Sequence, residues 1–329
     1  MAPTLILIAA CLYGISPILA KVAYMYGVTP LVLMTWRVTI AAGLFWSVGL
    51  AVRQISPVPV RLAAVLVALG TTLVPIQVFS YFFALSLLPA SSASVIVNTS
   101  PVHVAWMERL ALGERLAGGD LVLLGMIVAG ALLVAGATPH AGHPLGLAAL
   151  GAATIASAAY LIIQRRLVRY VPPFTVMAVI QLCSAVVYWS AGLATGQARV
   201  LPPAPAFVAI GASALSASLA SLLVLTALRT LAATRTAMLG MLEPVVTVAL
   251  SVALLNDTMT WARVVGIVTV LAGIAMFYLR LRQTGLGGRV ALSGAGGVSP
   301  RTGPADQPAA GGQAPSARPV PSRAPSSGA

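Results

Sequence analysis

Three ionisable side chains lie within long apolar segments of the sequence, where a charge is costly. Glu243 is near the middle of its segment, Arg37 lies nearly two turns inside another, and Lys21, the sole lysine, is close to the end of a third. Placing an ionised side chain at the centre of a bilayer costs on the order of a few kcal/mol. Each of these residues therefore needs a compensating environment, which is typical of a pathway for a solute or an ion.

Glu243 can be stabilised in several ways, and they lead to different predictions. Protonation, pairing with Arg37 or Lys21, and hydration beside Pro244 each lower the cost of burying the carboxyl group. Proton coupling requires a carboxyl group that takes up and releases a proton, whereas a permanent pairing would be structural. Arg37 is an anchor for a substrate carboxylate, a buried partner of Glu243, or a side chain that extends to the outer headgroups. Lys21 has the same three alternatives.

Polar side chains at helical spacing accompany these charges. Gln77 and Tyr81 are four residues apart and share one helix face, and Asn98 stands one turn before Pro101. Such groups either face a cavity or hold helices together through hydrogen bonds. Further amide and aromatic side chains would form walls suited to amino acids or similar amphipathic solutes, with helix packing as the alternative at each position. These side chains are Tyr13, Tyr160, Gln164, Gln181 and Trp106.

Pro101 and Pro244 each lie inside a predicted apolar helix. A proline in a helix removes one backbone hydrogen bond and bends the helix. Membrane helices tolerate such kinks without any functional role. The symmetric placement of the two prolines in the two halves of the chain instead favours a shared mechanical role or a shared site. The sequence leaves both interpretations open.

The histidines and cysteines form no recognisable metal site. His103 is a lone histidine in an apolar segment, and His140 and His143 stand in a connection without a third ligand nearby. Cys11 and Cys183 belong to separate apolar segments, where a small packing residue is the expected role. We therefore predict no metal, no cofactor and no disulfide framework.

The composition indicates that membrane-spanning helices carry all of these residues. Of the 329 residues, 59% are apolar and only 8% are charged, and a soluble fold of this composition could not cover its surface with polar groups. A spanning helix needs roughly 20 mostly apolar residues. We predict an all-α integral membrane protein with ten transmembrane helices, at residues 3–26, 31–52, 62–88, 91–112, 118–137, 145–168, 174–195, 205–229, 232–255 and 260–281.

The net charge of +13 follows the connections between these segments. Near segment ends, eleven arginines fall on alternate connections, and only Lys21, Arg199 and Arg263 fall on the others. The positive-inside rule then predicts cytoplasmic N- and C-termini in a cell (inner) membrane. The sequence shows no basic patch interleaved with aromatic residues, so we expect a lipid bilayer and a small solute as partners, and no nucleic acid. Residues 282–329, rich in Gly, Pro, Ser and Ala, are predicted to be a disordered cytoplasmic tail.

A single offset of 143 residues relates two halves of the chain. A unit of five helices begins and ends on opposite sides of the membrane, so a second copy fused to it enters the membrane upside down. We therefore predict inverted repeats at 3–137 and 145–281, an arrangement that gives a cavity between them two related conformations. The most informative matches are Pro30 with Pro173, Pro101 with Pro244, Gly130 with Gly273, and Glu114 with Asp257.

Two stretches at equivalent positions of the halves resemble a known family. Residues 242–274, LEPVVTVALSVALLNDTMTWARVVGIVTVLAGI, look like the proline-containing helix, acidic turn and glycine-spaced last helix of the EamA family of the drug/metabolite transporter superfamily. Residues 81–116, YFFALSLLPASSASVIVNTSPVHVAWMERLALGERL, are similar to the matching part of the first unit of that family. Lys21 and Arg37 also stand where first units often carry a Lys and an Arg. In the second half, Asn256–Asp257 replaces the usual Gly–Glu.

The resemblance covers residues 3–281 and implies a secondary transporter. Members of the family export amino acids, nucleosides and other metabolites, often driven by protons. We therefore expect an exporter of small metabolites such as amino acids that works by alternating access, with protons as a candidate coupling ion. The resemblance does not choose a substrate, and the oligomeric state is left open.

An intramembrane enzyme and a non-transporting membrane scaffold are the competing functions. The sequence contains no H-E-x-x-H motif, no G-x-S-x-G motif and no pair of intramembrane aspartates, so we expect no enzymatic activity. Short connections leave little chain for a domain that captures ligands outside the membrane. The duplicated architecture favours transport over both alternatives.

Overall fold

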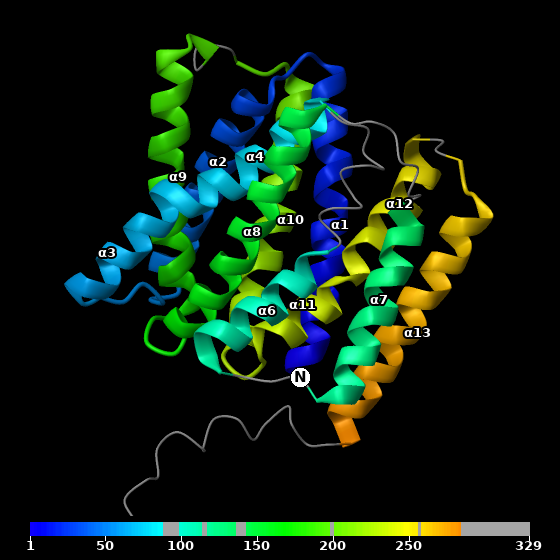
Figure 1. The fold of residues 1–329 in the computed structure, drawn as a ribbon. Helices are drawn as coiled ribbons and strands as arrows, with labels where there is room; N and C mark the ends of the chain where they lie inside the picture. Colours follow the sequence, from blue (N-terminus) through cyan, green and yellow to red (C-terminus); the bar gives the residue numbers. More distant parts are fainter. Residues whose placement is uncertain (88–98, 114–116, 136–142, 198–200, 256–257, 284–329) are drawn as a thin grey trace, which may run out of the picture. The chain divides into compact units, whose positions relative to one another are not determined.

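The computed structural model describes residues 1–87, 99–113, 117–135, 143–197, 201–255 and 258–283, and every regular element in these ranges is helical (Figure 1). The elements are α1 (Ala2–Met25), α2 (Pro30–Ala51), α3 (Val60–Ala68), the π-helical turn η1 (Leu69–Leu73), α4 (Val74–Leu87), α6 (Ser100–Leu112), α7 (Gly118–Ala135), α8 (Pro144–Leu167), α9 (Pro173–Ala194), α10 (Ala204–Leu228), α11 (Ala233–Gly240), α12 (Leu242–Leu255) and α13 (Trp261–Gln283).

Eight segments in the described ranges are long and apolar enough to cross a membrane. Two of them combine shorter elements, since α3, η1 and α4 form one segment and α11 and α12 form another. A ninth apolar helix, α7, is shorter, and of the predicted helix 91–112 the described part is α6. The all-helical membrane fold is thus confirmed, whereas the count of ten spans stays a prediction. The predicted tail, 282–329, lies outside the described residues from position 284 onward.

Prolines start several of these helices, because the first turn of a helix does not need their missing N–H. Pro30 and Pro173, which the offset of 143 residues pairs, begin α2 and α9. In α2 the side chain of Thr29 also accepts a hydrogen bond from the backbone N–H of Val32, at 3.3 Å. Pro144 begins α8 in the same way. The two halves therefore share helix boundaries as well as residues.

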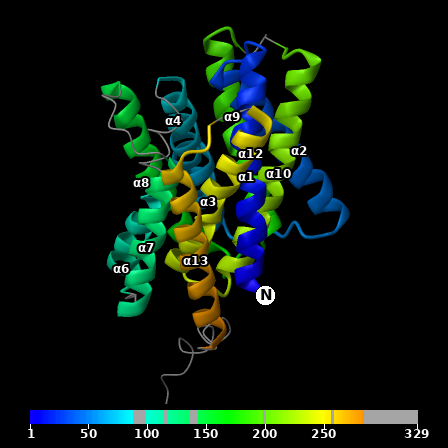
Figure 2. The same cartoon turned by 90° about the vertical axis from the view of Figure 1, so that its right-hand side faces the viewer.

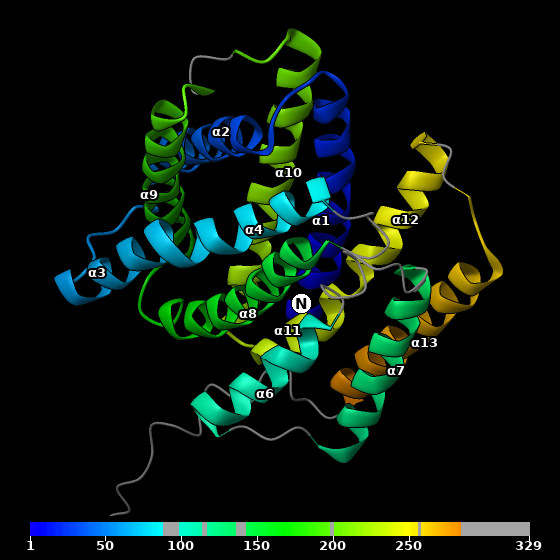
Figure 3. The ribbon, with the colours of Figure 1, turned by 45° about the horizontal axis from the view of Figure 1, so that its top comes forward.

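The packing of the helices follows the repeat. Helix α1 packs against α10 and α12, and its counterpart α8 packs against α4 and α6, the counterparts of α10 and α12. Helices α2 and α9 are counterparts that pack on each other, and Figure 3 shows them crossing beside the α4–α8 pair. Trp46 on α2 donates its indole N–H to the Ala178 carbonyl at 3.1 Å, and its mate Trp189 on α9 donates to Thr39 Oγ1 at 2.8 Å.

Helices α7 and α13 form the other pair of counterparts, and they lie side by side in Figures 1 and 2. A Cβ atom at Gly130 of α7 would meet Val270 of α13 at 2.9 Å, and a Cβ atom at Gly273 of α13 would meet Ile127 of α7 at 2.6 Å. The offset relates Gly130 to Gly273 and Ile127 to Val270. The two contacts are therefore reciprocal, as across a local two-fold axis.

Candidate functional site

A cavity of about 430 Å³ lies among the helices and receives residues from both repeats. The first repeat contributes side chains from α1, α2, α4 and α6, and the second from α8, α9, α10, α11 and α12. This volume is within the range that small-molecule sites in proteins occupy. Most of the lining is apolar, and a small set of polar and charged groups interrupts it, which is the composition that orients a solute.

Arg37 is the charged group on the α2 side of the cavity. One guanidinium nitrogen donates to Ser16 Oγ at 3.1 Å, and Ser16 Oγ lies 2.8 Å from Ser213 Oγ. The other terminal nitrogen is 4.0 Å from the sulfur of Met34, and the guanidinium carbon lies 5.7 Å from the centroid of the Phe82 ring. A guanidinium group has five N–H donors. Its contacts with described residues therefore leave donors for a further partner.

Glu243 reaches the same cavity from the first turn of α12. The helix breaks two residues before it, at Met241, since α11 ends at Gly240 and α12 begins at Leu242. A carboxylate in a first helical turn is stabilised by the backbone N–H groups there. Within the described ranges, the Glu243 carboxylate makes no hydrogen bond or ion pair, and no ion pair joins it to Arg37.

Two further polar atoms of the cavity wall are buried without a hydrogen-bond partner among the described residues. They are Gln77 Oε1 on α4 and Ser218 Oγ on α10. The amide nitrogen of Gln77 donates to Ser157 Oγ at 3.3 Å, which fixes the direction of the unpaired oxygen. Buried polar groups are nearly always hydrogen-bonded in native proteins. Unpaired groups that line a cavity are what a bound solute or water would satisfy.

The cavity brings together most of the residues that the sequence predicts for the site. Its lining includes Tyr13, Arg37, Gln77, Tyr81, Tyr160, Gln164, Gln181, Glu243 and Pro244. The hydroxyl of Tyr13 lies 2.7 Å from Ser221 Oγ, which ties α1 to α10 at this wall.

Four predicted residues are placed elsewhere or not described. Trp106 is 63% exposed and does not line the cavity, so it faces away from the predicted solute path. Lys21 is also absent from the lining, and Pro101 is in the first turn of α6, beside the lining residue Ser100. Asn98 lies outside the described residues.

A family model for EamA-like transporters matches the sequence twice, over residues 1–136 and 144–279. The chain belongs to the EamA-like transporter family. Its members are membrane transporters of the drug/metabolite transporter superfamily, not enzymes, and this chain is accordingly a multi-pass membrane protein. The resemblance seen in the sequence is confirmed.

The fold is similar to that of a protein of known crystal structure. The two agree with a TM-score of 0.71 at 20% sequence identity, and the match covers 86% of this chain and 98% of that one. No curated protein matches the sequence. At this identity the structural likeness shows the fold alone.

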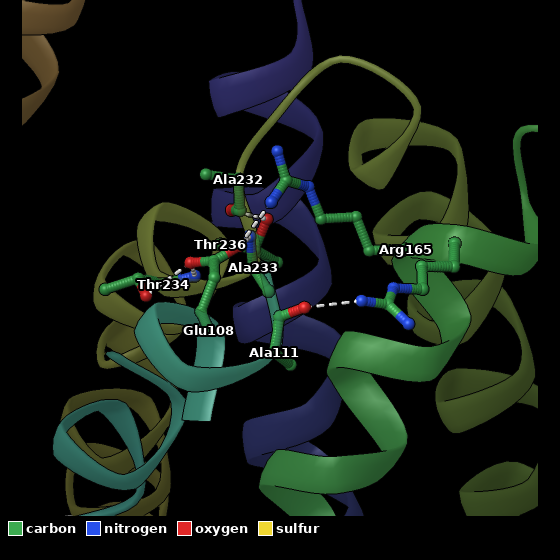
Figure 4. Close-up of polar contacts among 8 residues, drawn as sticks. Glu108, Ala111, Arg165, Ala232, Ala233, Thr234 and Thr236 are labelled. Carbon is green, nitrogen blue, oxygen red and sulfur yellow. Dashed lines mark hydrogen bonds and ion pairs between the residues drawn. The ribbon is translucent and has the colours of Figure 1, made fainter. Parts of the chain in front are cut away.

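The EamA-like chain also contains a buried charge cluster that the sequence does not single out. Glu108 on α6 is 3% exposed, and its Oε1 accepts from Arg165 Nη1 of α8 at 2.5 Å and from the backbone N–H of Ala233 at 2.8 Å (Figure 4). Its Oε2 accepts from the backbone N–H of Thr234 at 2.8 Å and from Thr234 Oγ1 at 2.5 Å. We call Glu108, Arg165, Ala233 and Thr234 the Glu108 cluster.

A second, looser cluster lies at the same end of the EamA-like fold. Asp120 at the start of α7 is 4.0 Å from an Arg235 nitrogen on α11 and 3.6 Å from an Arg280 nitrogen on α13. We call these three residues the Asp120 cluster. The end of the helices that carries both clusters is called the arginine end. Thr4 of α1 also lies there, with its hydroxyl 3.3 Å from that of Tyr278 on α13.

The sequence signals for the missed residues are weak for a physical reason. Ser16 and Ser218 stand in apolar helices, where serine usually bonds to its own helix or packs between helices. Glu108 stands near a predicted helix end among arginines, and such a position favours a solvated carboxylate as the simplest interpretation. A search for acidic residues of one repeat that lack a charged counterpart in the other would have found Glu108, because the offset places Ser251 opposite it.

Proposed function

We propose that this protein is a secondary transporter that carries a small zwitterionic metabolite, such as an amino acid, through the cavity by alternating access. The observation that carries the proposal is the pair of opposite charges in one cavity. Arg37 and Glu243 both line it, one from each repeat, and no ion pair joins them. Opposite charges that face a low-dielectric cavity without contacting each other suit a solute that carries both charges.

The groups around each charge support this assignment. Arg37 keeps free N–H donors, which match a carboxylate in a planar, two-pronged contact. The Glu243 carboxylate and the unpaired Gln77 Oε1 are acceptors, which match the N–H donors of an ammonium group. The rings of Tyr81 and Phe82, with centroids 5.1 Å apart, give an amphipathic solute an apolar wall.

The proposed architecture is ten spanning helices in two inverted repeats, with the arginine end in the cytoplasm of a cell whose inner membrane holds the protein. The reciprocal packing of α7 on α13 and of α2 on α9 supports inversion. Counterpart helices that pack antiparallel about a two-fold axis enter the membrane from opposite sides. The positive-inside rule supports the orientation, and the usual direction of transport in the family supports export.

Proton coupling through Glu243 is part of the proposal. The carboxyl group is inside the cavity and has no permanent partner among the described residues, so a proton and a solute ammonium group can occupy it in turn. Competition of this kind links the uphill movement of one species to the downhill movement of the other.

Uptake into liposomes tests the function. The purified protein, reconstituted with and without a proton gradient, is offered a panel of radiolabelled amino acids, nucleosides and organic acids. We expect at least one zwitterion to be transported, and Arg37→Gln to abolish that transport because the solute carboxylate loses its anchor. Arg263→Gln is the matched control, because Arg263 bonds to the Thr258 carbonyl outside the cavity. A panel on which no solute moves, or equal rates for the two arginine variants, would refute the proposal.

A further inference from the structure

The Glu108 cluster lies directly beyond the cavity on three different helices. On α6, Val104 lines the cavity and Glu108 follows one turn later. On α8, Gln164 lines the cavity and Arg165 is the next residue. On α11, Thr236 lines the cavity and Thr234 stands two residues before it. The cluster therefore forms the floor of the cavity at the arginine end.

The cluster also joins the two repeats. Glu108 belongs to the first repeat, whereas Arg165, Ala233 and Thr234 belong to the second. Both carboxylate oxygens accept hydrogen bonds from the second repeat, and the Arg165 and Glu108 side chains are 3% and 4% exposed. This buried carboxylate accepts hydrogen bonds both from an arginine and from the first N–H groups of a helix. Separating it from them is costly, because separation leaves buried charges unpaired.

The opposite end of the repeat has no matching pair of charges. The offset of 143 residues relates Glu108 to Ser251 and Arg165 to Val22, neither of which is ionisable. In an inverted repeat, the contact that closes the cavity at the opposite end is formed by the equivalent positions. Here these positions are uncharged. The cluster therefore stabilises the conformation that is closed at the arginine end, and the positions that the offset relates to Glu108 and Arg165 hold no matching charge pair.

From this geometry we infer that Glu108 and Arg165 are gating residues, whose contact closes the cavity at the arginine end and separates in each transport cycle. The inference rests on the proposed function, since a gate matters only if a solute crosses. Two contacts of α6 have to separate, one with α8 through Arg165 and one with α11, an eight-residue helix that a break at Met241 separates from α12. Movement of α6 away from both α8 and α11 disconnects both carboxylate oxygens of Glu108 and opens the floor beside Thr236.

Thiol labelling of a cavity residue measures this gate without any transport. In a background with Cys11→Ala and Cys183→Ala, Thr236→Cys places a thiol on the cavity floor. A membrane-impermeant, charged methanethiosulfonate is applied to vesicles of each orientation. Arg166→Cys in the same background, on an exposed position beside Arg165, identifies the vesicles whose arginine end faces the reagent.

We expect Thr236→Cys to react slowly from the arginine end and about tenfold or more faster after Glu108→Gln or Arg165→Gln. From the opposite end, the same substitutions should slow its reaction because the population shifts. Asp120→Asn is the control for Glu108→Gln, because Asp120 on α7 is an acid at the same end that pairs with Arg235 and Arg280 and does not join α6 to α8. Arg166→Gln is the control for Arg165→Gln, because Arg166 is the exposed neighbour that bonds to the Ala111 carbonyl. Neither control should change the rate.

Equal labelling rates in the cluster variants and their controls would overturn the gate, provided that size-exclusion profiles show folded protein. Reduced thermal stability without a change in labelling would also overturn it, because a contact that only stabilises the fold gives that result. The two proposals fail separately. Altered labelling without uptake of any solute on the panel would retain the gate and reject the transport proposal, whereas uptake with unchanged labelling would do the reverse.

Discussion

Replacement of Glu243 by glutamine tests whether this one side chain couples transport to protons. Glutamine keeps the size and the hydrogen-bonding capacity of a protonated carboxyl group but cannot release a proton. We expect Glu243→Gln to abolish accumulation driven by a proton gradient and to leave exchange of solute for solute, measured in the same liposomes. Asp120→Asn, outside the cavity, should retain gradient-driven accumulation. Unaltered uphill transport by Glu243→Gln would remove this residue from the coupling mechanism.

Glu243 and Arg37 also illustrate which residues of a membrane site can be predicted from the sequence. A charge within an apolar segment is conspicuous, so residue type and position identify both, and both line the cavity. How the protein stabilises each charge is harder to predict from the sequence. The structure places Glu243 in the first turn of α12 rather than in an ion pair, and it gives Arg37 a serine rather than a carboxylate. Serines and aromatic residues are common in apolar helices, so residue type alone does not show which of them face a cavity. The sequence therefore predicts Trp106 for the site and does not predict Ser218.

The α7–α13 pair shows how glycines determine the packing of two helices. The offset identifies Gly130 and Gly273 from the sequence, and the structure puts both at the contact between these helices. Gly125 and Gly266 are not related by the offset, and their surroundings in the structure also differ. A Cβ atom at Gly266 would lie 2.6 Å from the Val134 backbone nitrogen, whereas one at Gly125 would meet nothing within 4 Å. Sequence spacing alone could not assign the close approach to Gly266.

Alanine substitutions at Gly266 and Gly125 should therefore have different effects. Gly266→Ala forces the backbones of α13 and α7 apart, and we expect it to lower the free energy of unfolding by about 1–3 kcal/mol. Gly125→Ala adds a methyl group in open space and reduces the conformational freedom of the unfolded chain, so it should be neutral or stabilising by at most about 1 kcal/mol. Thermal unfolding in detergent compares them. A Gly266→Ala protein as stable as the parent would contradict the contact.

For the fold as a whole, composition and the length of the apolar segments are sufficient to predict helices in a membrane, and one offset is sufficient to predict the two repeats. The sequence does not predict which helices pack on each other. The related pairs α1 with α10 and α8 with α4 are seen only in the structure. The break at Met241 also escapes the sequence, which predicts one continuous helix over 232–255. A proline indicates a bend, but whether the bend becomes a break depends on neighbouring helices.

Fusions to a reporter test the inverted topology of the chain. Arg61 is the second residue of α3, and its offset mate Ala204 is the first residue of α10. We expect reporters fused after Arg61 and after Ala204 to be active on opposite sides of the membrane, because inverted repeats reverse the direction of equivalent helices. Activity of alkaline phosphatase outside the cytoplasm and of a fluorescent protein inside it gives the two readings. Both fusions on one side would exclude inversion.

The π-helical turn η1 has a consequence for the lengths of the two repeats. A π turn contains about one more residue than an α turn, and the counterpart helix α10 contains no such turn. Helix α3 begins at Val60, one residue before the position that the offset assigns to the start of α10. The added residue is thus absorbed within η1, and the connection before α3 is shortened to match. Deleting one residue of η1 should therefore convert the turn to an ordinary α turn and keep α3 in phase with Gln77 and the rest of the cavity wall. The two halves therefore differ by one added residue in this helix, and the offset of 143 residues still relates the positions before and after it.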